Sequence, residues 1–244
     1  MQIIDLRTER QCTPIQIDSA HPRFSWRVDT KEQNWYQESY RIQVWKTCLG
    51  KKQCKVWDSG TVLSRAMSQI PYEGEPLKSD SCYSWTVEVK KEGGQAAVVS
   101  EEASFETAFY SDSEWNAEWI TEPQNIYHLY RTEFKADEKI AKAKLYICGL
   151  GHEECVINGK LVTDAVMEAG WTDYNKSCLY CAYDVSELVT AGDNAICVKL
   201  GDGMYRVPGG RYVYFPRSYG DRKLLATLRI IYEDGRTQEN LDRR

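Results

Sequence analysis

Ala169-Gly-Trp-Thr-Asp-Tyr174 lies at the centre of the stretch that decides the fold of this chain. The stretch runs from Ile147 to Tyr205. Asn158-Gly159 precedes it and lies between two apolar runs, which is the strongest short-range signal for a two-residue β-hairpin. Gly149-Leu-Gly151 predicts another turn, and a Gly201-Asp-Gly203 loop follows. We therefore expect strands of a β-sandwich joined by turns that carry aromatic and acidic side chains at the rim.

Length and composition narrow the class of protein. The chain has 244 residues, enough for one large or two ordinary domains. Its 42% hydrophobic and 12% aromatic content is enough for packed cores and argues against disorder. A net charge of −5 and a pI near 5.4 argue against nucleic acid or an anionic membrane as a partner. No apolar run approaches the roughly 20 residues that span a bilayer.

Cysteine usage and the N-terminal sequence bear on the compartment. Nine scattered cysteines are not typical of a disulfide framework, so we expect reduced, mostly buried thiols in a reducing compartment. Cys178-Leu-Tyr-Cys181 has the spacing of half a zinc site, but we predict a strand there, in which residues three apart face opposite sides. We expect no metal and no cofactor. Residues 1–7 show no signal peptide, which favours the cytoplasm, or a periplasmic or secreted location if a leader had been removed.

Short alternating segments fill residues 21–107. Tyr40-Arg-Ile-Gln-Val-Trp45 places Tyr40, Ile42 and Val44 on one face. Turn signals recur about every ten residues, the pattern of an all-β sandwich of about 100 residues. Residues 1–20 are predicted to be irregular. Four apolar residues there are candidate edge-strand anchors: Ile3, Leu6, Ile15 and Ile17.

A polar stretch predicts the boundary between two domains, which we place at residues 1–108 and 118–244 with a linker at 109–117. Leu224 to Tyr232 is apolar on nearly both faces and predicts a central strand. Asp234-Gly235 begins a further hairpin, but the chain then ends at Arg244 with no return strand, which predicts a truncated second domain. Only Asp184 to Thr190 predicts a helical turn. The expected fold class is all-β, with two β-sandwich domains.

Two sets of motifs, one in each domain, carry a family resemblance. The first domain contains His21-Pro-Arg-Phe-Ser-Trp26, Trp57-Asp-Ser-Gly60, Tyr83-Ser-Trp-Thr-Val87 and Phe105-Glu-Thr107. The second contains Leu145-Tyr-Ile-Cys-Gly-Leu-Gly151, Ile157-Asn-Gly159, Gly170-Trp-Thr-Asp-Tyr174 and Leu200-Gly-Asp-Gly203. In this order, over about residues 20–235, they resemble the N-terminal region of bacterial α-L-rhamnosidases, glycoside hydrolase family 78. Ala169 and Met204 depart from the proline and tryptophan that are common there.

The resemblance implies a fibronectin type III-like or Ig-like domain followed by a jelly-roll, galactose-binding-like domain. It also implies that terminal α-L-rhamnosides are hydrolysed, with inversion, by carboxylates of an (α/α)6 barrel that follows these modules. This chain lacks such a barrel, so we carry over no catalytic residue and expect the chain alone to be inactive. Its implied roles are to scaffold the missing barrel and to contact a rhamnosylated glycoside or oligosaccharide. A free-standing carbohydrate-binding module and a pure structural spacer are the alternatives.

Two segments supply the candidate carbohydrate-binding residues. In the first they are Trp171, Asp173 and Tyr174, because sugars pack C–H faces on aromatic rings and bond carboxylates through hydroxyls. The favoured interpretation of this loop is nevertheless structural, with Trp171 plugging the end of the sandwich and Tyr174 bonding backbone.

The second segment, Met204 to Tyr219, is rich in Tyr and Arg and contains no acid. Arg stacks on aromatic rings and binds hydroxyls or carboxylates. A docking surface for a neighbouring domain would explain this composition equally well. The candidates in this segment are Tyr205, Arg206, Arg211 and Tyr212.

A cluster of acidic residues raises the question of catalysis. Glycoside hydrolysis needs two carboxyl groups about 5–5.5 Å or about 6.5–9.5 Å apart. Acidic side chains are mostly solvated surface groups, so we expect no catalytic pair here. The residues are Glu153, Glu154, Asp164, Glu168 and Asp173.

Overall fold

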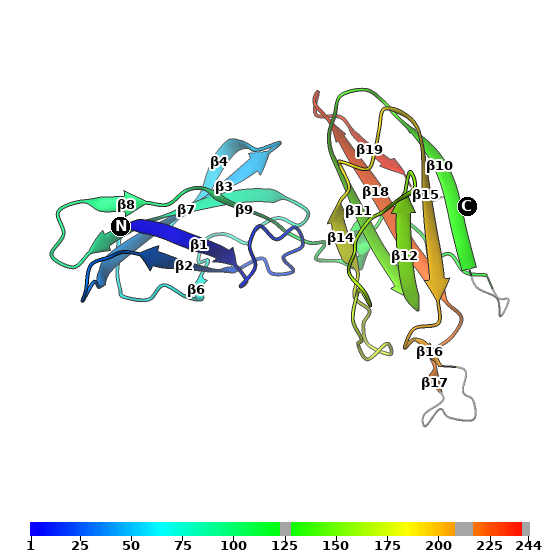
Figure 1. The fold of residues 1–244 in the computed structure, drawn as a ribbon, viewed down its shortest axis with the longest axis horizontal. Coiled ribbons are helices and arrows are strands. Elements are labelled where there is room, and N and C mark those ends of the chain that lie inside the picture. The colour runs from blue at the N-terminus through cyan, green and yellow to red at the C-terminus, as the bar shows by residue number, and fades with distance from the viewer. Residues whose placement is uncertain (123–127, 208–216, 241–244) are drawn as a thin grey trace. The chain divides into compact units, whose positions relative to one another are not determined.

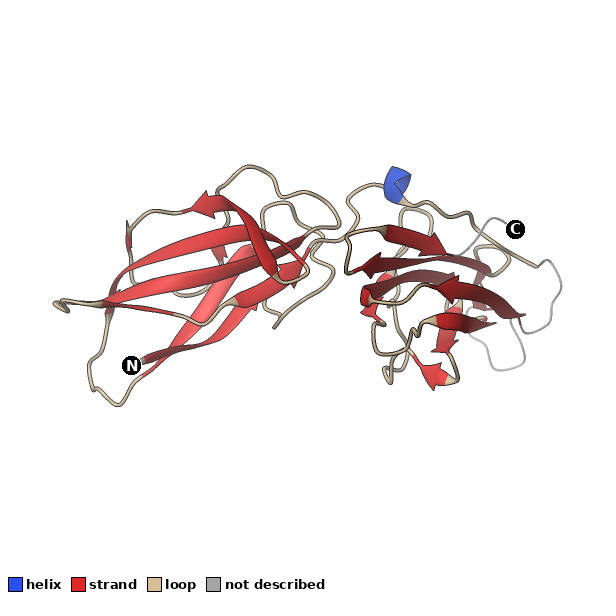
Figure 2. Ribbon diagram, turned by 90° about the horizontal axis from the view of Figure 1, so that it is seen from above, coloured by secondary structure: helices blue, strands red, loops and turns tan. Residues whose placement is uncertain are grey.

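The computed structural model describes residues 1–122, 128–207 and 217–240. It divides the chain into two compact units, Met1–Glu114 and Trp115–Arg244. Strands dominate both units, and the only helix among the described residues is the 3₁₀ turn η1, Asp112–Glu114 (Figure 2). The predicted all-β fold class is confirmed. The proposed limits of the domains, 1–108 and 118–244, stay predictions.

Two antiparallel sheets form the first unit (Figure 1). One has the order β1-β2-β6, with β1 at Gln2–Thr8, β2 at Arg23–Asp29 and β6 at Ile70–Pro71. The other has the order β4-β3-β7-β8, with β5 paired to β3 and β9 paired to β7. Its strands are β3 Gln37–Cys48, β4 Lys51–Asp58, β5 Val62–Leu63, β7 Cys82–Lys91, β8 Ala97–Val99 and β9 Ala103–Glu106.

Alternation along the strands builds the core of this unit. Ile42 and Val44 on β3 are fully buried, as the period of two predicts, and Tyr40 beside them is 8% exposed. Trp85 on β7 is also fully buried, and its indole Nε1 donates to Thr8 Oγ1 at 3.2 Å. The prediction of an irregular start was wrong for residues 2–8, since β1 pairs with β2 on both sides of a bulge between Ile4 and Arg7 and buries Ile3.

The second unit is also a sandwich of two antiparallel sheets. One has the order β10-β15-β12-β13 and the other β14-β11-β18-β19, while β16 and β17 form a separate hairpin. The strands of the first sheet are β10 His128–Ala136, β12 His152–Ile157, β13 Lys160–Leu161 and β15 Gly192–Gly201. Those of the second are β11 Ile140–Leu150, β14 Cys181–Asp184, β18 Lys223–Tyr232 and β19 Thr237–Asn240, and the hairpin is β16 Arg206–Val207 with β17 Arg217–Ser218.

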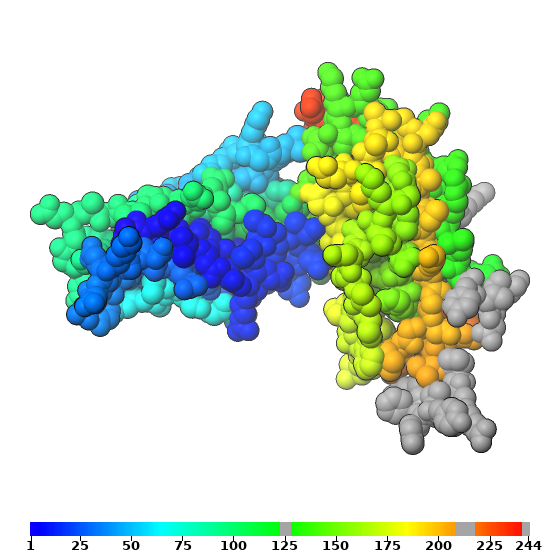
Figure 3. All heavy atoms as spheres, viewed as in Figure 1, coloured from blue at the N-terminus to red at the C-terminus, as the bar shows by residue number. Residues whose placement is uncertain are grey.

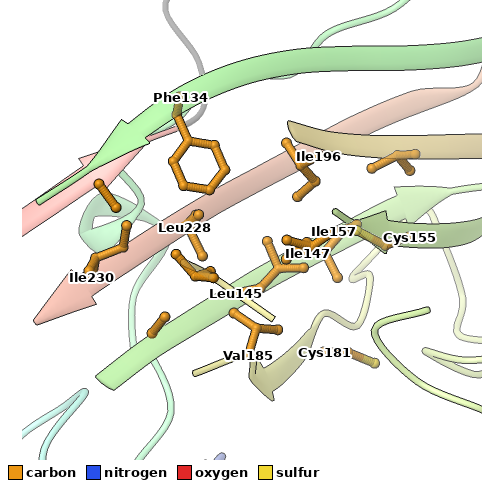
Figure 4. Close-up of a cluster of buried hydrophobic side chains, with 14 of the residues drawn as sticks. Phe134, Leu145, Ile147, Cys155, Ile157, Cys181, Val185, Ile196, Leu228 and Ile230 are labelled. Carbon is orange, nitrogen blue, oxygen red and sulfur yellow. The ribbon is translucent and has the colours of Figure 1, made fainter. Parts of the chain in front are cut away.

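The inner faces of these two sheets meet in one apolar cluster (Figure 4). Phe134 and Ile196 come from one sheet, and Leu145 and Leu228 come from the other. As predicted, β18 is an interior strand, between β11 and β19. The expectation of no return strand was wrong, because β19 pairs with β18 from Leu228↔Asn240 to Ile231↔Thr237. The turn Asp234-Gly235 therefore completes a hairpin.

Two local predictions in the second unit, a hairpin and a helical turn, had different outcomes. Asn158 and Gly159 have φ of 49° and 80° and join β12 to β13, which confirms the Asn-Gly hairpin. The predicted helical turn is reduced to one α-type hydrogen bond, from the Val189 amide to the Val185 carbonyl at 3.2 Å.

Cysteine burial differs from the prediction. No disulfide joins any of the nine cysteines, but only Cys148, Cys155 and Cys181 are buried. The prediction of mostly buried thiols was therefore wrong. The predicted strand across Cys178 begins only at Cys181, because the preceding residues belong to the loop after β13. Among the described residues, no helix has the length and apolar character that crossing a membrane requires.

Candidate functional site

Two loops meet at one end of the second unit, and their meeting point is a cluster of three tyrosine rings. The first, residues 162–180, connects β13 to β14, and the second is the root of the β16–β17 hairpin (Figure 1). Tyr174 lies edge-on to both Tyr205 and Tyr219, with ring centroids 5.2 Å apart in each case. Tyr205 and Tyr219 stack at 5.9 Å, and Tyr205 is only 5% exposed. This tyrosine cluster fixes the two loops to each other.

Trp171 projects from the first loop into solvent, with 62% of its surface exposed. The favoured interpretation of this residue as a plug of the sandwich was therefore wrong. The backbone explains why it turns outward, since Met167, Ala169 and Gly170 have φ of 64°, 66° and 57°. These left-handed residues reverse the chain directly before the indole. A space-filling view shows the yellow-green surface of this part of the chain (Figure 3).

Asp173 stabilises the shape of the loop. Its carboxylate accepts a hydrogen bond from the Asn175 amide at 3.2 Å and pairs with Lys176 at 3.2 Å. Its carbonyl accepts from the Lys176 amide at 2.7 Å, which closes a tight turn. Tyr174, half buried, follows directly and points into the tyrosine cluster. The carboxylate is thus already hydrogen-bonded to its own loop.

Arg206 is held by an ion pair. Its Nη1 donates to Asp202 Oδ1 at 3.1 Å, and Arg222 Nη1 donates to the same oxygen at 2.8 Å. The two guanidinium side chains are 17% and 4% exposed. The arginine predicted to stack on a sugar thus braces the root of the hairpin. Arg211 and Tyr212, the remaining candidates, lie outside the described residues.

Close backbone contact explains two of the glycine motifs. A Cβ added to Gly203, which has φ of 53°, would lie 2.7 Å from the Gly151 carbonyl carbon and oxygen. A Cβ added to Gly151 would lie 2.2 Å from the Gly201 carbonyl oxygen. These residues lie beside the pairing of His152 with Gly201. The motifs therefore bring two loop backbones into close contact.

Sequence reasoning missed a carboxylate pocket next to the first loop, with a volume of about 200 Å³. It is lined by β12, by residues 161–168 and by Tyr183. Three of its carboxyl groups belong to Glu153, Asp164 and Glu168, so part of the acidic set does come together. Glu153 could have been found from the alternation that places it on the same face as Cys155 and Ile157.

Glu153 has unusual surroundings within this pocket. It is 8% exposed, and neither carboxylate oxygen accepts a hydrogen bond from the described residues. Burial raises the pKa of Glu153 to about 7, and the charge of Glu168 adds to this effect, while the nearby amides of Glu153 and Gly149 oppose it. Glu168 Oε2 accepts from the Cys181 thiol at 3.3 Å.

Comparison with known proteins finds a matching domain family for each half of this all-β chain. Residues 3–111 match the family described as "Rha78A-like, N-terminal immunoglobulin domain". Residues 138–240 match the "Alpha-L-rhamnosidase N-terminal domain". The protein therefore combines an immunoglobulin-like sandwich with a second β-sandwich of the rhamnosidase type. Both halves of the chain thus match domains found in the N-terminal region of α-L-rhamnosidases.

Individual relatives agree with these matches. An α-L-rhamnosidase of Formosa agariphila is 29% identical over 93% of this chain, which spans 27% of that protein. Among solved structures, the α-L-rhamnosidase from Dictyoglumus thermophilum has a TM-score of 0.87 and 32% identity, over 99% of this chain and 29% of that one. The Aspergillus terreus enzyme has a TM-score of 0.82 and 29% identity, over 99% and 28%. The chain thus spans little more than a quarter of each of these relatives.

Proposed function

We propose that this chain is the non-catalytic N-terminal part of an α-L-rhamnosidase. We also propose that the aromatic surface formed by Trp171 and the tyrosine cluster, here called the rim, contacts a rhamnosylated glycoside. The observation that carries the first part is coverage, since nearly all of this chain aligns with about a quarter of each relative. In this proposal, a catalytic region elsewhere in the same polypeptide hydrolyses terminal α-L-rhamnosides. The two sandwiches support that region.

The rim contact rests on Trp171. An indole that is 62% exposed on a loop anchored by Tyr174 offers a flat apolar face at a defined position. The C–H faces of a sugar ring pack on such a face, and a tryptophan that is not needed in the core has no evident structural role. Asp173 and Arg206 contribute less, because both are already hydrogen-bonded within the chain.

Calorimetric titration of the chain with methyl α-L-rhamnoside tests the rim. We expect weak binding that Trp171→Ala abolishes. Trp119→Ala is the matched control, because Trp119 is a second exposed tryptophan of the same unit, at 40%, and it lies outside the loop. Binding that survives Trp171→Ala, or that is lost equally in Trp119→Ala, would contradict a sugar contact at Trp171.

Hydrolysis of an aryl α-L-rhamnoside tests the non-catalytic assignment. We expect no turnover by this chain, because Glu153, the most buried carboxyl group of the pocket, is shielded from solvent. Turnover that disappears in Glu168→Gln would overturn the assignment. If neither sugar binding nor turnover is found, the chain is a structural spacer, and the rim proposal fails while the domain matches stand.

A further inference from the structure

The carboxylate pocket has an excess of acidic side chains, and binding a carbohydrate does not require such an excess. Neither Lys nor Arg is among the described residues that line the pocket. Glu154 at its margin is neutralised by Lys199, with Nζ 2.7 Å from Oε1. By contrast, Glu153, Asp164 and Glu168 form no ion pair with any cation among the described residues. Acidic groups around a small space repel one another when they ionise, and a cation would relieve the repulsion.

The burial of Glu153 adds an independent observation. More than nine tenths of this residue is buried, its oxygens accept no well-formed hydrogen bond from the described residues, and it lines the same pocket. The carboxylate is pressed against Gly149, because a Cβ added there would lie 2.4 Å from Oε2. A buried carboxyl group without a partner is costly to ionise, so a positively charged donor brought by a ligand would be stabilised beside it.

The rest of the wall indicates what kind of cation fits. No set of three or more His, Cys, Asp or Glu residues in the described part of the chain is placed to hold a metal ion. Ile147, Leu161 and Val162 form an apolar part of the pocket wall. One side of the pocket is therefore acidic and the other is apolar. A ligand with a positively charged group attached to a hydrocarbon body would match both sides.

We propose that this pocket binds a small organic cation, with its ammonium group toward Glu168 and Glu153 and its body against Leu161 and Val162. Glu168 makes the direct contact, and Glu153 behind it contributes negative charge in surroundings that exclude water. The cavity of about 200 Å³ has room for a single six-membered ring with its substituent. This inference does not depend on the proposed contact with a rhamnoside.

NMR titration of the ¹⁵N-labelled chain with cyclohexylammonium chloride, and in parallel with cyclohexanol, tests the proposal. The two probes have the same ring and differ in charge. We expect the ammonium to shift the amide signals of Thr163 and Ala165 with millimolar affinity and the alcohol to bind at least about 5-fold more weakly. Equal binding of the two probes, or shifts confined to other parts of the chain, would overturn the proposal.

Variants locate the charge that is responsible. Glu168→Gln should weaken cyclohexylammonium binding by about 5-fold or more, and Asp164→Asn, at an exposed position that tolerates substitution, by a smaller factor. Glu187→Gln is the control, because Glu187 is an exposed acid outside the pocket, and it should leave the affinity unchanged. A control variant that weakens binding as much as Glu168→Gln would show that only the net charge matters, and the pocket assignment would fail.

Discussion

Glu153 lies on the inner face of β12, in line with Cys155 and Ile157, where its carboxyl group is separated from water. Period-two alternation predicts this orientation, but the general preference of acids for the surface argues against it. For Glu153, the residue type was therefore a misleading guide to burial, whereas the strand period gave the correct orientation. Trp171 shows the reverse, since its residue type favours burial and three left-handed residues of the loop turn it outward.

The raised pKa of Glu153 predicts a stability that falls with pH. Its folded pKa of about 7 is above its ordinary value of 4.5, so its contribution is fully present below 4.5 and is lost as the pH rises through 7. The loss approaches about 3 kcal/mol for a shift of this size. Urea unfolding across this window should show the decline in the wild type and a flatter profile in Glu153→Gln. An unchanged slope in the variant, with Glu187→Gln as control, would contradict this account.

Gly203→Ala should destabilise the second unit, because the new Cβ would collide with the Gly151 backbone at a residue that already has positive φ. We expect a loss of about 2–4 kcal/mol. Gly159→Ala separates the two causes, since Gly159 also has positive φ but its Cβ would meet nothing within 4 Å. Its expected cost in urea unfolding is only about 1 kcal/mol, and equal losses in the two variants would exclude the collision.

At the scale of elements, strands with strict alternation were predictable and edge strands were not. Burial alternates along β3 and the interior strand β18 is apolar on both faces, so both carry a strong pattern. In β1, by contrast, only Ile3 and Thr8 are buried and a bulge interrupts the pairing, which weakens the period. The return strand β19 is polar, because it lies at the edge of its sheet and pairs on one side only.

The Asn158 hairpin depends on its side chain as well as on its backbone. Nδ2 donates to Leu188 O at 2.9 Å and to Asn194 Oδ1 at 2.7 Å, and Oδ1 accepts from the Ala195 amide at 2.9 Å. Asn158→Ala removes these bonds and strains a residue with positive φ, at an expected cost of about 2–3 kcal/mol. Hydrogen exchange should accelerate in β12, β13 and the start of β15. Asn158→Gly also removes the side-chain hydrogen bonds but keeps the preference for positive φ. A loss of stability as large as that of Asn158→Ala would therefore show that the hydrogen bonds dominate.

At the scale of the molecule, each unit has a hydrophobic core of its own. This separation was predictable, because each half contains enough alternating strands for one sandwich. The composition of the rim was also visible in the sequence. Its arrangement was not, since Tyr174 and Tyr219 are far apart in the chain and meet only through the fold.

Separate cores predict separate responses to core mutation. Ile42→Ala should destabilise the first unit by about 2–5 kcal/mol, because Ile42 is fully buried. Hydrogen exchange monitored by mass spectrometry should accelerate in β3 and β7 and remain unchanged in β11 and β18. Leu145→Ala, at an equally buried site of the second unit, should produce the opposite distribution. Acceleration throughout the chain in either variant would show that the two cores unfold as one.

The tyrosine cluster has a consequence for how costly it is to bind at the rim. Loops that must be ordered by a ligand consume part of the interaction energy in lost conformational freedom. Here the rings of Tyr174, Tyr205 and Tyr219 already restrain both loops against each other. A molecule that spans the two loops therefore meets a preorganised surface, and more of its contact energy is retained as affinity.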